Sequence, residues 1–392
     1  MWERATQLRL FNQREVTQYV DQSGTSSQPW AVSDTSPSRQ LATSSRPRRS
    51  KVQIVSTPLV LEHPSGVRPR RVRTGGRDLA ALEARPAEGV PLRGVGVLLP
   101  GFTGSKEDFT AILAPLAARG WWTVALDQRG QFESPGPDRV AAYGLADYGA
   151  DALVIINGLI VEIAEESASI DTRGDGDLDV HLVGHSLGGL VARETALRVW
   201  TDSSATVLTS LTLLCSGPGA LPEEAHAGLA ELHAALPQTD LELIWTIVRT
   251  RAGESLSGDP ITDFLRKRFL ANNPWALKSM SVILRESPDR TEELARLVTA
   301  DPGSRRVLVA YGEGDDAWPT DVQDEMARRL GSAAVVLAGA GHSPAAESHR
   351  SAASTVELLH RFWSAGADAD RDSDRDSHGE SDGESTQRAD SV

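Results

Sequence analysis

The sequence is poor in cysteine and in long apolar runs. Its 392 residues contain one cysteine, Cys215, and a single thiol can form neither an internal disulfide nor a thiolate metal site. No apolar run approaches the roughly 18 residues that a membrane span needs. No signal peptide, with a charged and then an apolar region, opens the chain. We therefore expect a cytoplasmic protein without an integral membrane span.

An excess of positive charge is also missing. The chain has 40 Lys and Arg against 54 Asp and Glu, a formal net charge of −14. Nucleic-acid binding depends on an excess of Lys and Arg that neutralises phosphates, so we expect no nucleic-acid partner. The histidines form no H-E-x-x-H motif, and residues 101–106 lack the spacing of a phosphate-binding P-loop. We expect neither a metal nor a cofactor.

Both ends of the chain are short of large apolar residues. Residues 22–50 consist mostly of Ser, Thr, Gln, Pro and Arg, and residues 365–392 carry nine acidic and three basic side chains. Such segments cannot bury enough surface to offset the entropy lost on ordering. We expect a mostly disordered N-terminal extension over residues 1–65 and a disordered acidic tail over residues 365–392.

Between the two ends, short apolar runs alternate with longer stretches of helical periodicity, which is typical of an α/β fold with a mostly parallel sheet flanked by helices. The predicted strands are residues 95–99, 123–126, 180–183, 207–214, 307–310 and 334–337. The predicted helices are residues 105–119, 146–166, 187–200, 321–330 and 345–363. Residues 219–304 show helical patterns but no strand, which indicates an inserted helical cap. The core then comprises residues 66–218 and 305–364.

One predicted strand runs directly into a serine motif. Residues 178–183 lead into Gly184-His185-Ser186-Leu187-Gly188, and a helical pattern follows. This is G-x-S-x-G in the strand-turn-helix setting of a nucleophile elbow, whose strained turn exposes the serine above the sheet edge. Residues 379–383 also fit the motif, but they lie in the acidic tail with no strand or helix around them. Ser186 is therefore the candidate nucleophile.

A serine nucleophile needs a base, and the base needs a carboxylate that orients it. In a parallel sheet, both are expected on loops that follow later strands. His342 follows the last predicted strand in a Gly-rich loop, whereas His349 and His360 lie on the final helix. The loop after strand 307–310 holds several carboxylates, so the chain order is Ser, Asp, His, as in enzymes with this elbow.

These motifs make residues 66–364 resemble the α/β-hydrolase fold family, and in particular its serine esterases and lipases with a helical cap. The family's acid motif, G-x-x-D-x-x-x-P, is matched by Gly312, Asp315 and Pro319. The resemblance implies that Asp315 is the acid of a catalytic triad, with Asp316 as the alternative. No carboxylate follows strand 207–214, where some family members place the acid.

The resemblance extends to the loop after the first predicted strand. Residues 100–104 are similar to the family's H-G-x loop, with Pro100 where histidine is common. The match implies that the backbone NH groups of Phe102 and Leu187 form the oxyanion hole. As an alternative, this Gly-rich turn is an ordinary entry to a helix.

The loop after the second predicted strand is similar to the family's D-x-R-G-x-G-x-S loop. It spans residues 127–134, and Phe132 stands where the second glycine is usual. In relatives this loop braces the wall of the active site. We therefore expect a structural role, in which Asp127 and Arg129 pair with each other rather than with substrate.

The predicted cap is rich in large apolar side chains, most of which a helical insert needs for its own packing. A layer above a catalytic serine usually also lines the substrate pocket. The candidate pocket residues are His185, Trp245 and Trp275. We expect a hydrophobic small-molecule substrate, and the net negative charge disfavours strongly anionic ones.

The resulting hypothesis is a cofactor-independent serine hydrolase that cleaves a carboxylic ester through an acyl-enzyme on Ser186, His342 and Asp315. Because the fold does not fix the scissile bond, hydrolysis of C–C bonds, perhydrolysis, and lactone or amide hydrolysis stay open. Ser186 argues against the dehalogenases and epoxide hydrolases that attack with aspartate. A non-catalytic ligand-binding protein on the same fold is the alternative from another class. Protein partners and oligomeric state are not predicted.

Overall fold

The computed structural model describes residues 56–74, 76–166, 178–202 and 208–378, without the side chains of residues 366–378. Most of the predicted N-terminal extension and the last part of the acidic tail, residues 379–392, lie outside the described residues. The predicted core and the predicted cap lie almost entirely within them.

Within the described residues, the central sheet has eight strands in the order β1-β2-β4-β3-β5-β6-β7-β8. Strand β2 is antiparallel to both of its neighbours, and all other neighbouring strands are parallel. The predicted strands are confirmed as β3 to β8. The bounds are β1 (Val67–Thr74), β2 (Arg77–Ala84), β3 (Gly94–Leu99), β4 (Trp121–Leu126), β5 (Asp179–His185), β6 (Ser210–Leu214), β7 (Arg306–Gly312) and β8 (Val335–Leu337).

Strands β1 and β2 are absent from the sequence prediction. Strand β1 reads VRPRRVRT, with four arginines and a proline, which is far from an apolar strand pattern. The structure pairs this charge across the hairpin, since Glu83 of β2 accepts hydrogen bonds from Arg68 at 2.7 Å and Arg70 at 2.8 Å. Pro69 is tolerated because β1 is the edge strand of the sheet.

Helices cover both faces of the sheet. Helices α2 (Thr110–Ala117) and α11 (His349–His378) pack on one face, and α3 (Leu145–Glu166), α4 (Leu187–Thr201) and α10 (Thr320–Arg329) pack on the other. Alternate residues of β3 divide between the two buried clusters: Val97 and Leu99 contribute to the α3–α4 side, and Leu98 to the α2–α11 side. A short 3-10 helix, η2 (Lys106–Phe109), precedes α2.

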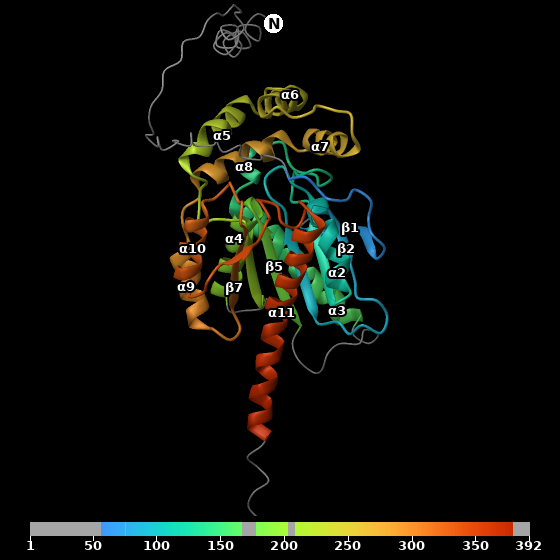
Figure 1. The fold of residues 1–392 in the computed structure, drawn as a ribbon, viewed down its shortest axis with the longest axis vertical. Coiled ribbons are helices and arrows are strands. Elements are labelled where there is room, and N and C mark those ends of the chain that lie inside the picture. Colours follow the sequence, from blue (N-terminus) through green and yellow to red (C-terminus); the bar gives the residue numbers. More distant parts are fainter. Residues whose placement is uncertain (1–55, 75, 167–177, 203–207, 379–392) are drawn as a thin grey trace, which may run out of the picture. The chain divides into compact units, whose positions relative to one another are not determined.

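The cap consists of four helices, α5 (Glu223–Ala235), α6 (Leu241–Ala252), α7 (Pro260–Leu270) and α8 (Pro274–Glu286), which lie together over the sheet region that contains β5 (Figure 1). Side chains of Asp240, Asp259 and Asn273 cap the N-termini of α6, α7 and α8 by accepting backbone NH groups. The connections into and out of the cap run side by side, because Ala220 N donates to Ser287 O at 2.8 Å.

The predicted cap segment, residues 219–304, has two parts. Helix α9 (Thr291–Ala300) follows the cap in sequence but packs against α4 and α10 beside the sheet (Figure 1). The sequence does not separate α9 from the cap, because both are helical and lack an intervening strand. The segment that stands over the sheet edge is therefore α5 to α8.

Helix α11 is longer than predicted. It continues to His378, beyond the predicted boundary at residue 364, since no proline interrupts it and helix propagation is cooperative.

Helix α3 is more apolar than expected. The stretch Val140–Glu165, which contains most of α3, is long and apolar enough to cross a membrane by length and composition, with a mean hydropathy of 1.4. Helix α3 packs against α4 and β1. Core helices pass the same criterion, so this stretch is weak evidence for a span.

Candidate active site

Ser186 lies on a sharp turn between the end of β5 and the start of α4. Its backbone angles are φ 55° and ψ −122°, in a region that non-glycine residues rarely adopt. The turn depends on its glycines: a Cβ on Gly184 would lie 2.2 Å from Gly188 O, and one on Gly188 would lie 2.3 Å from Leu99 O. The elbow geometry expected from the sequence is thus present.

His342 and Asp315 form the candidate base and acid pair. His342 Nδ1 lies 2.7 Å from Asp315 Oδ1, and the Asp315 side chain is fully buried while the imidazole is 11% exposed. Asp315 follows β7 and His342 follows β8. Of the two adjacent aspartates, the hydrogen bond to the imidazole is made by Asp315. Burial raises the pKa of Asp316, and its carboxyl makes no such bond among the described contacts.

Three donors keep Asp315 ionised. Burial alone would raise the pKa of its carboxyl, but the hydrogen bond and charge of His342, Ala317 N at 3.0 Å and Gln323 Nε2 at 2.8 Å together hold the pKa below its usual range. An ionised carboxylate accepts the Nδ1 proton of the imidazole and leaves Nε2 free as a base. The pair therefore has the electrostatics of an acid that orients a histidine.

His185 holds the His342 loop against the serine elbow. His185 Nε2 lies 2.7 Å from the carbonyl oxygen of His342, and the two ring centroids are 5.0 Å apart. This contact brings the loop after β8 to the residue that precedes Ser186. No hydrogen bond between Ser186 Oγ and the His342 ring occurs among the residues that the structure describes. The contact between these two loops is made through His185.

The structure places the three candidate pocket residues differently. His185 is buried, and burial together with the nearby His342 lowers its pKa to about 4. It thus stays neutral and braces the loop. Trp245 is 1% exposed inside the cap, with its ring 5.6 Å from Phe269, and Trp275 is half-buried in the first turn of α8. A role of the two indoles in the substrate pocket stays a prediction.

The candidate oxyanion donors flank Ser186. The first NH of a helix has no acceptor within the helix, and Leu187 begins α4. Neither Leu187 NH nor Phe102 NH donates to a partner within the described part of the chain. The loop before Phe102 approaches the serine closely, since a Cβ on Gly101 would lie 3.0 Å from Ser186 Cβ and 3.4 Å from Ser186 Oγ. The geometry is compatible with an oxyanion hole at this position.

Two residues near the pair are absent from the sequence prediction. Gln323, on the first turn of α10, donates to Asp315 Oδ2 and to the carbonyl of Trp318. The Trp318 ring lies 6.4 Å from the His342 ring, and its Nε1 donates to Ala220 O at 3.2 Å. Their only signal in the sequence is that they lie near the acid motif, with Gln323 eight residues beyond Asp315. This spacing does not indicate which atoms they contact.

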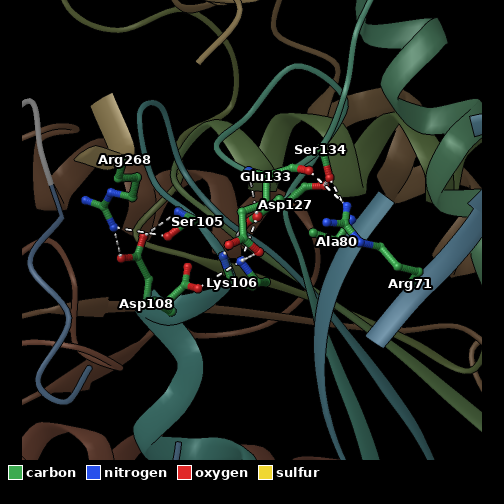
Figure 2. Close-up of polar contacts among 10 residues, drawn as sticks. Arg71, Ala80, Ser105, Lys106, Asp108, Asp127, Glu133, Ser134 and Arg268 are labelled. Carbon is green, nitrogen blue, oxygen red and sulfur yellow. Dashed lines mark hydrogen bonds and ion pairs between the residues drawn. The ribbon is translucent and has the colours of Figure 1, made fainter. Parts of the chain in front are cut away.

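The loop of residues 127–134 is anchored by ion pairs, but not the predicted one. Asp127 pairs with Lys106, whose Nζ and backbone N both lie 2.8 Å from the carboxylate (Figure 2). Arg129 instead pairs with Asp151 of α3, at 2.6 Å. The expected pair between Asp127 and Arg129 is therefore wrong, because each residue meets a charge from a different element. The predicted structural role fits these buried contacts.

Lys106 carries the positive charge of a buried cluster. Its ammonium contacts Glu107 at 2.8 Å and Glu133 at 3.0 Å besides Asp127. Burial would lower the pKa of Lys106, but the surrounding carboxylates outweigh it and raise the pKa. For Asp127, burial is the larger influence and raises the pKa of the carboxyl, and the positive charge of Lys106 opposes this rise.

A second buried ion pair joins the cap to this region. Arg268 of α7 donates to Asp108 Oδ1 at 2.7 Å and to Ser105 Oγ at 3.3 Å (Figure 2). Both side chains are almost completely buried, with 0% and 3% exposure. Ser105 and Asp108 directly follow the candidate oxyanion loop. The cap is thus fixed to the segment that directly follows the loop with Phe102.

His185, Cys215 and His342 place potential metal-ligand atoms within 4.8 Å of one another. One nitrogen of each imidazole is already engaged, since His185 Nε2 contacts the His342 carbonyl and His342 Nδ1 contacts Asp315. Burial raises the pKa of the Cys215 thiol well above its usual value, which disfavours the thiolate that a metal requires. This donor set does not fit a resident metal.

Comparisons with known proteins show the family and the fold of the chain. A protein-family model described as the alpha/beta hydrolase family matches residues 97–354. A search of curated proteins finds no match. The solved structure of an esterase from Exiguobacterium antarcticum is 16% identical, with a TM-score of 0.56 and coverage of 76% of this chain and 100% of that one.

Other similar structures have the same fold. A thermophilic esterase from Thermogutta terrifontis is 19% identical, with a TM-score of 0.55 and coverage of 76% of this chain and 99% of that one. An epoxide hydrolase from Vigna radiata is 14% identical, with a TM-score of 0.53 and coverage of 77% and 99%. At such identities the likeness shows the fold alone. Because the family model matches more than half of its length, the chain belongs to the alpha/beta hydrolase family.

Proposed function

We propose that the protein is a serine hydrolase that cleaves a hydrophobic small-molecule carboxylic ester through an acyl-enzyme. The observation that supports this most is the 2.7 Å contact between His342 Nδ1 and a buried Asp315, on a loop held against the residue before Ser186. An oriented histidine beside a serine on a strained elbow has the arrangement of a catalytic triad.

In the proposed reaction, His342 Nε2 removes the proton of Ser186 Oγ while the oxygen attacks the ester carbonyl. Asp315 keeps the Nδ1 proton in place and stabilises the imidazolium. The NH groups of Phe102 and Leu187 stabilise the negative charge on the carbonyl oxygen. His342 then gives its proton to the leaving alcohol, and water releases the acid from the acyl-enzyme by the reverse sequence.

The proposed preference for a hydrophobic substrate follows from the cap above the site. Ser186 is 7% exposed, and the cap that stands over its edge of the sheet buries mostly apolar side chains. We expect a substrate that reaches Ser186 beneath this cap to leave water for a more apolar surrounding, which favours apolar acyl or alkyl groups. The formal charge of −14 further disfavours anionic substrates at low ionic strength.

The test combines a serine-reactive fluorophosphonate probe with p-nitrophenyl esters graded in acyl length. Ser186→Ala should lower kcat by at least about 10³-fold and abolish labelling, because the nucleophile is lost, while the melting temperature stays near that of the parent. Ser381→Ala is the matched control, since it removes the serine of the second G-x-S-x-G string, and it should label and turn over normally.

The outcomes separate the alternatives. Turnover retained in purified Ser186→Ala would contradict the proposal. Labelling of Ser186 without hydrolysis of any ester would direct attention to amide, lactone, C–C or peracid chemistry on the same serine. Tight binding of an apolar ligand with neither labelling nor turnover would support a non-catalytic binding protein.

A further inference from the structure

Two buried glutamines hold the candidate oxyanion loop. Gln128 Nε2 donates to Pro100 O at 3.0 Å, and Gln131 Nε2 donates to Gly101 O at 2.9 Å. The two residues are 4% and 0% exposed. Pro100 stands where the family commonly has histidine, and these contacts show how the loop is fixed without that side chain.

The orientation of the Gln131 amide is fixed from both ends. Its Nε2 faces a carbonyl oxygen, and its Oε1 accepts the backbone NH of Gln128 at 3.2 Å. A flipped amide would place oxygen against oxygen and NH₂ against NH, so this orientation alone satisfies both neighbours. The Gln131 backbone N also donates to Gln128 O at 2.8 Å, which closes the turn that carries both side chains.

The bond to Gly101 O controls the direction of Phe102 NH. The Gly101 carbonyl and the Phe102 NH belong to the same peptide unit, and in a planar trans peptide the two groups point in opposite directions. A peptide next to glycine rotates with little steric hindrance. Without the Gln131 amide, Gly104 N would be the one remaining donor to this carbonyl among the described contacts, and the Gly101–Phe102 peptide could turn its NH away from Ser186.

From this geometry, and resting on the proposed function, we infer that Gln131 is a positioning residue of the oxyanion hole. It does not touch substrate. By holding Gly101 O, together with Gly104 N at 3.1 Å, it fixes the Gly101–Phe102 peptide and with it the direction of Phe102 NH, which the proposed function requires to point at the oxyanion. Gln128 holds the preceding peptide, which carries no donor of the proposed hole.

This difference between the glutamines gives a matched pair of variants, Gln131→Met and Gln128→Met. Each replaces a buried amide with an apolar side chain of similar length and removes one bond to a carbonyl of the loop. The measurements are kcat and KM for the best p-nitrophenyl ester, the inhibition constant of an aryl boronic acid, and the melting temperature. A boronic acid forms a tetrahedral adduct on serine whose oxygen occupies the oxyanion hole.

We expect Gln131→Met to lower kcat between about tenfold and hundredfold with KM within about threefold, because the loss of an oxyanion donor affects the transition state. The inhibition constant of the boronic acid should rise by the same factor as kcat/KM falls. Gln128→Met should show a somewhat smaller loss of melting temperature, because its side chain makes one of these hydrogen bonds and that of Gln131 makes two, and an at least fivefold smaller loss of kcat. Gln131→Leu, which removes the donor with a shorter apolar side chain, serves if Gln131→Met does not fold.

Failure of this inference is distinguishable from failure of the proposed function. If the parent protein labels and turns over, and the two glutamine variants lose kcat and boronic acid affinity equally, Gln131 has no specific role in the hole. If the parent neither labels with fluorophosphonate nor hydrolyses any ester, the serine hydrolase proposal fails, and this inference fails with it.

Discussion

Replacement of Arg268 by methionine tests whether the cap packs on the core through the buried ion pair that the structure shows. Arg268 comes from α7 in the cap and Asp108 from the segment after the candidate oxyanion loop. The guanidinium donates to Asp108 Oδ1 at 2.7 Å, to Ser105 Oγ at 3.3 Å and to the backbone oxygen of Ser56. Methionine preserves much of the apolar stem of arginine but removes the charge and every donor.

The expected loss follows from burial. In Arg268→Met the Asp108 side chain, 3% exposed, would remain buried without its counter-charge, and breaking a buried pair in this way costs about 3–5 kcal/mol of unfolding free energy. For a domain of this size, 1 kcal/mol corresponds to about 2 °C in melting temperature. We therefore expect the melting temperature to fall by about 6–10 °C.

The control is the double variant Arg268→Met/Asp108→Asn, which removes both charges. It should recover at least half of the loss, because a neutral side chain no longer leaves an unpaired buried charge, and the double-mutant cycle should give a coupling of about 2–3 kcal/mol. Thermal unfolding followed by circular dichroism measures Arg268→Met, Asp108→Asn and the double variant against the parent. A loss of less than about 1 kcal/mol of unfolding free energy in Arg268→Met is typical of exposed ion pairs. That result would refute the reasoning, because the pair between Arg268 and Asp108 would then not be buried beneath the cap.

Two further predictions concern the acid of the pair and the edge hairpin. Gln323→Leu should lower kcat about tenfold with little change in KM, because Asp315 loses one charge-assisted hydrogen bond worth about 1.5 kcal/mol; steady-state kinetics checks this, and an unchanged kcat would rule out the support assigned to Gln323. Glu83→Gln should cost about 2 kcal/mol at pH 7. Burial alone would raise the pKa of Glu83, but Arg70 and Arg85 outweigh it and hold the pKa below the unfolded value, so the ionised form stabilises the fold fully above about pH 4.5 and less as the pH falls through the folded pKa. The gap in melting temperature between the parent and Glu83→Gln should therefore shrink in acid, and a constant gap from pH 7 to pH 3 would contradict this sign.

The sequence predicted the parts of the fold that follow from local pattern. Strands β3 to β7 are short apolar runs buried mostly on both faces, and the edge strand β8 is a short apolar run of which Leu337 is buried, so composition alone identifies all six. The candidate nucleophile elbow combines a strand, a glycine-bounded serine and a helix, so Ser186 could be placed at the sheet edge. Because loops that follow parallel strands meet at one edge of the sheet, Asp315 after β7 and His342 after β8 could be placed at the same edge.

What the sequence could not predict depends on contacts between distant elements. The arginines of strand β1 form ion pairs with Glu83 and Glu162, which stabilise the strand. The local sequence indicates neither ion pair. Asp127 and Arg129 are two residues apart in a loop, but Lys106 and Asp151 bind them from other elements. Gln323 and Gln131 act on atoms of Asp315 and Gly101 that only the folded chain brings near.

The loop of residues 127–134 connects the cap with the oxyanion loop. Phe132 has φ 37°, which costs a non-glycine residue about 1–2 kcal/mol, and glycine at this position would avoid that cost. Its ring lies 5.7 Å from the Phe264 ring of α7 in an edge arrangement, with Lys106 Nζ 4.7 Å from the ring centroid. Contacts with the cap thus offset the strain of a residue that departs from the family's glycine. Phe132 directly follows Gln131. The turn that packs against the cap through Phe132 therefore also positions the Gln131 amide, which donates to Gly101 O.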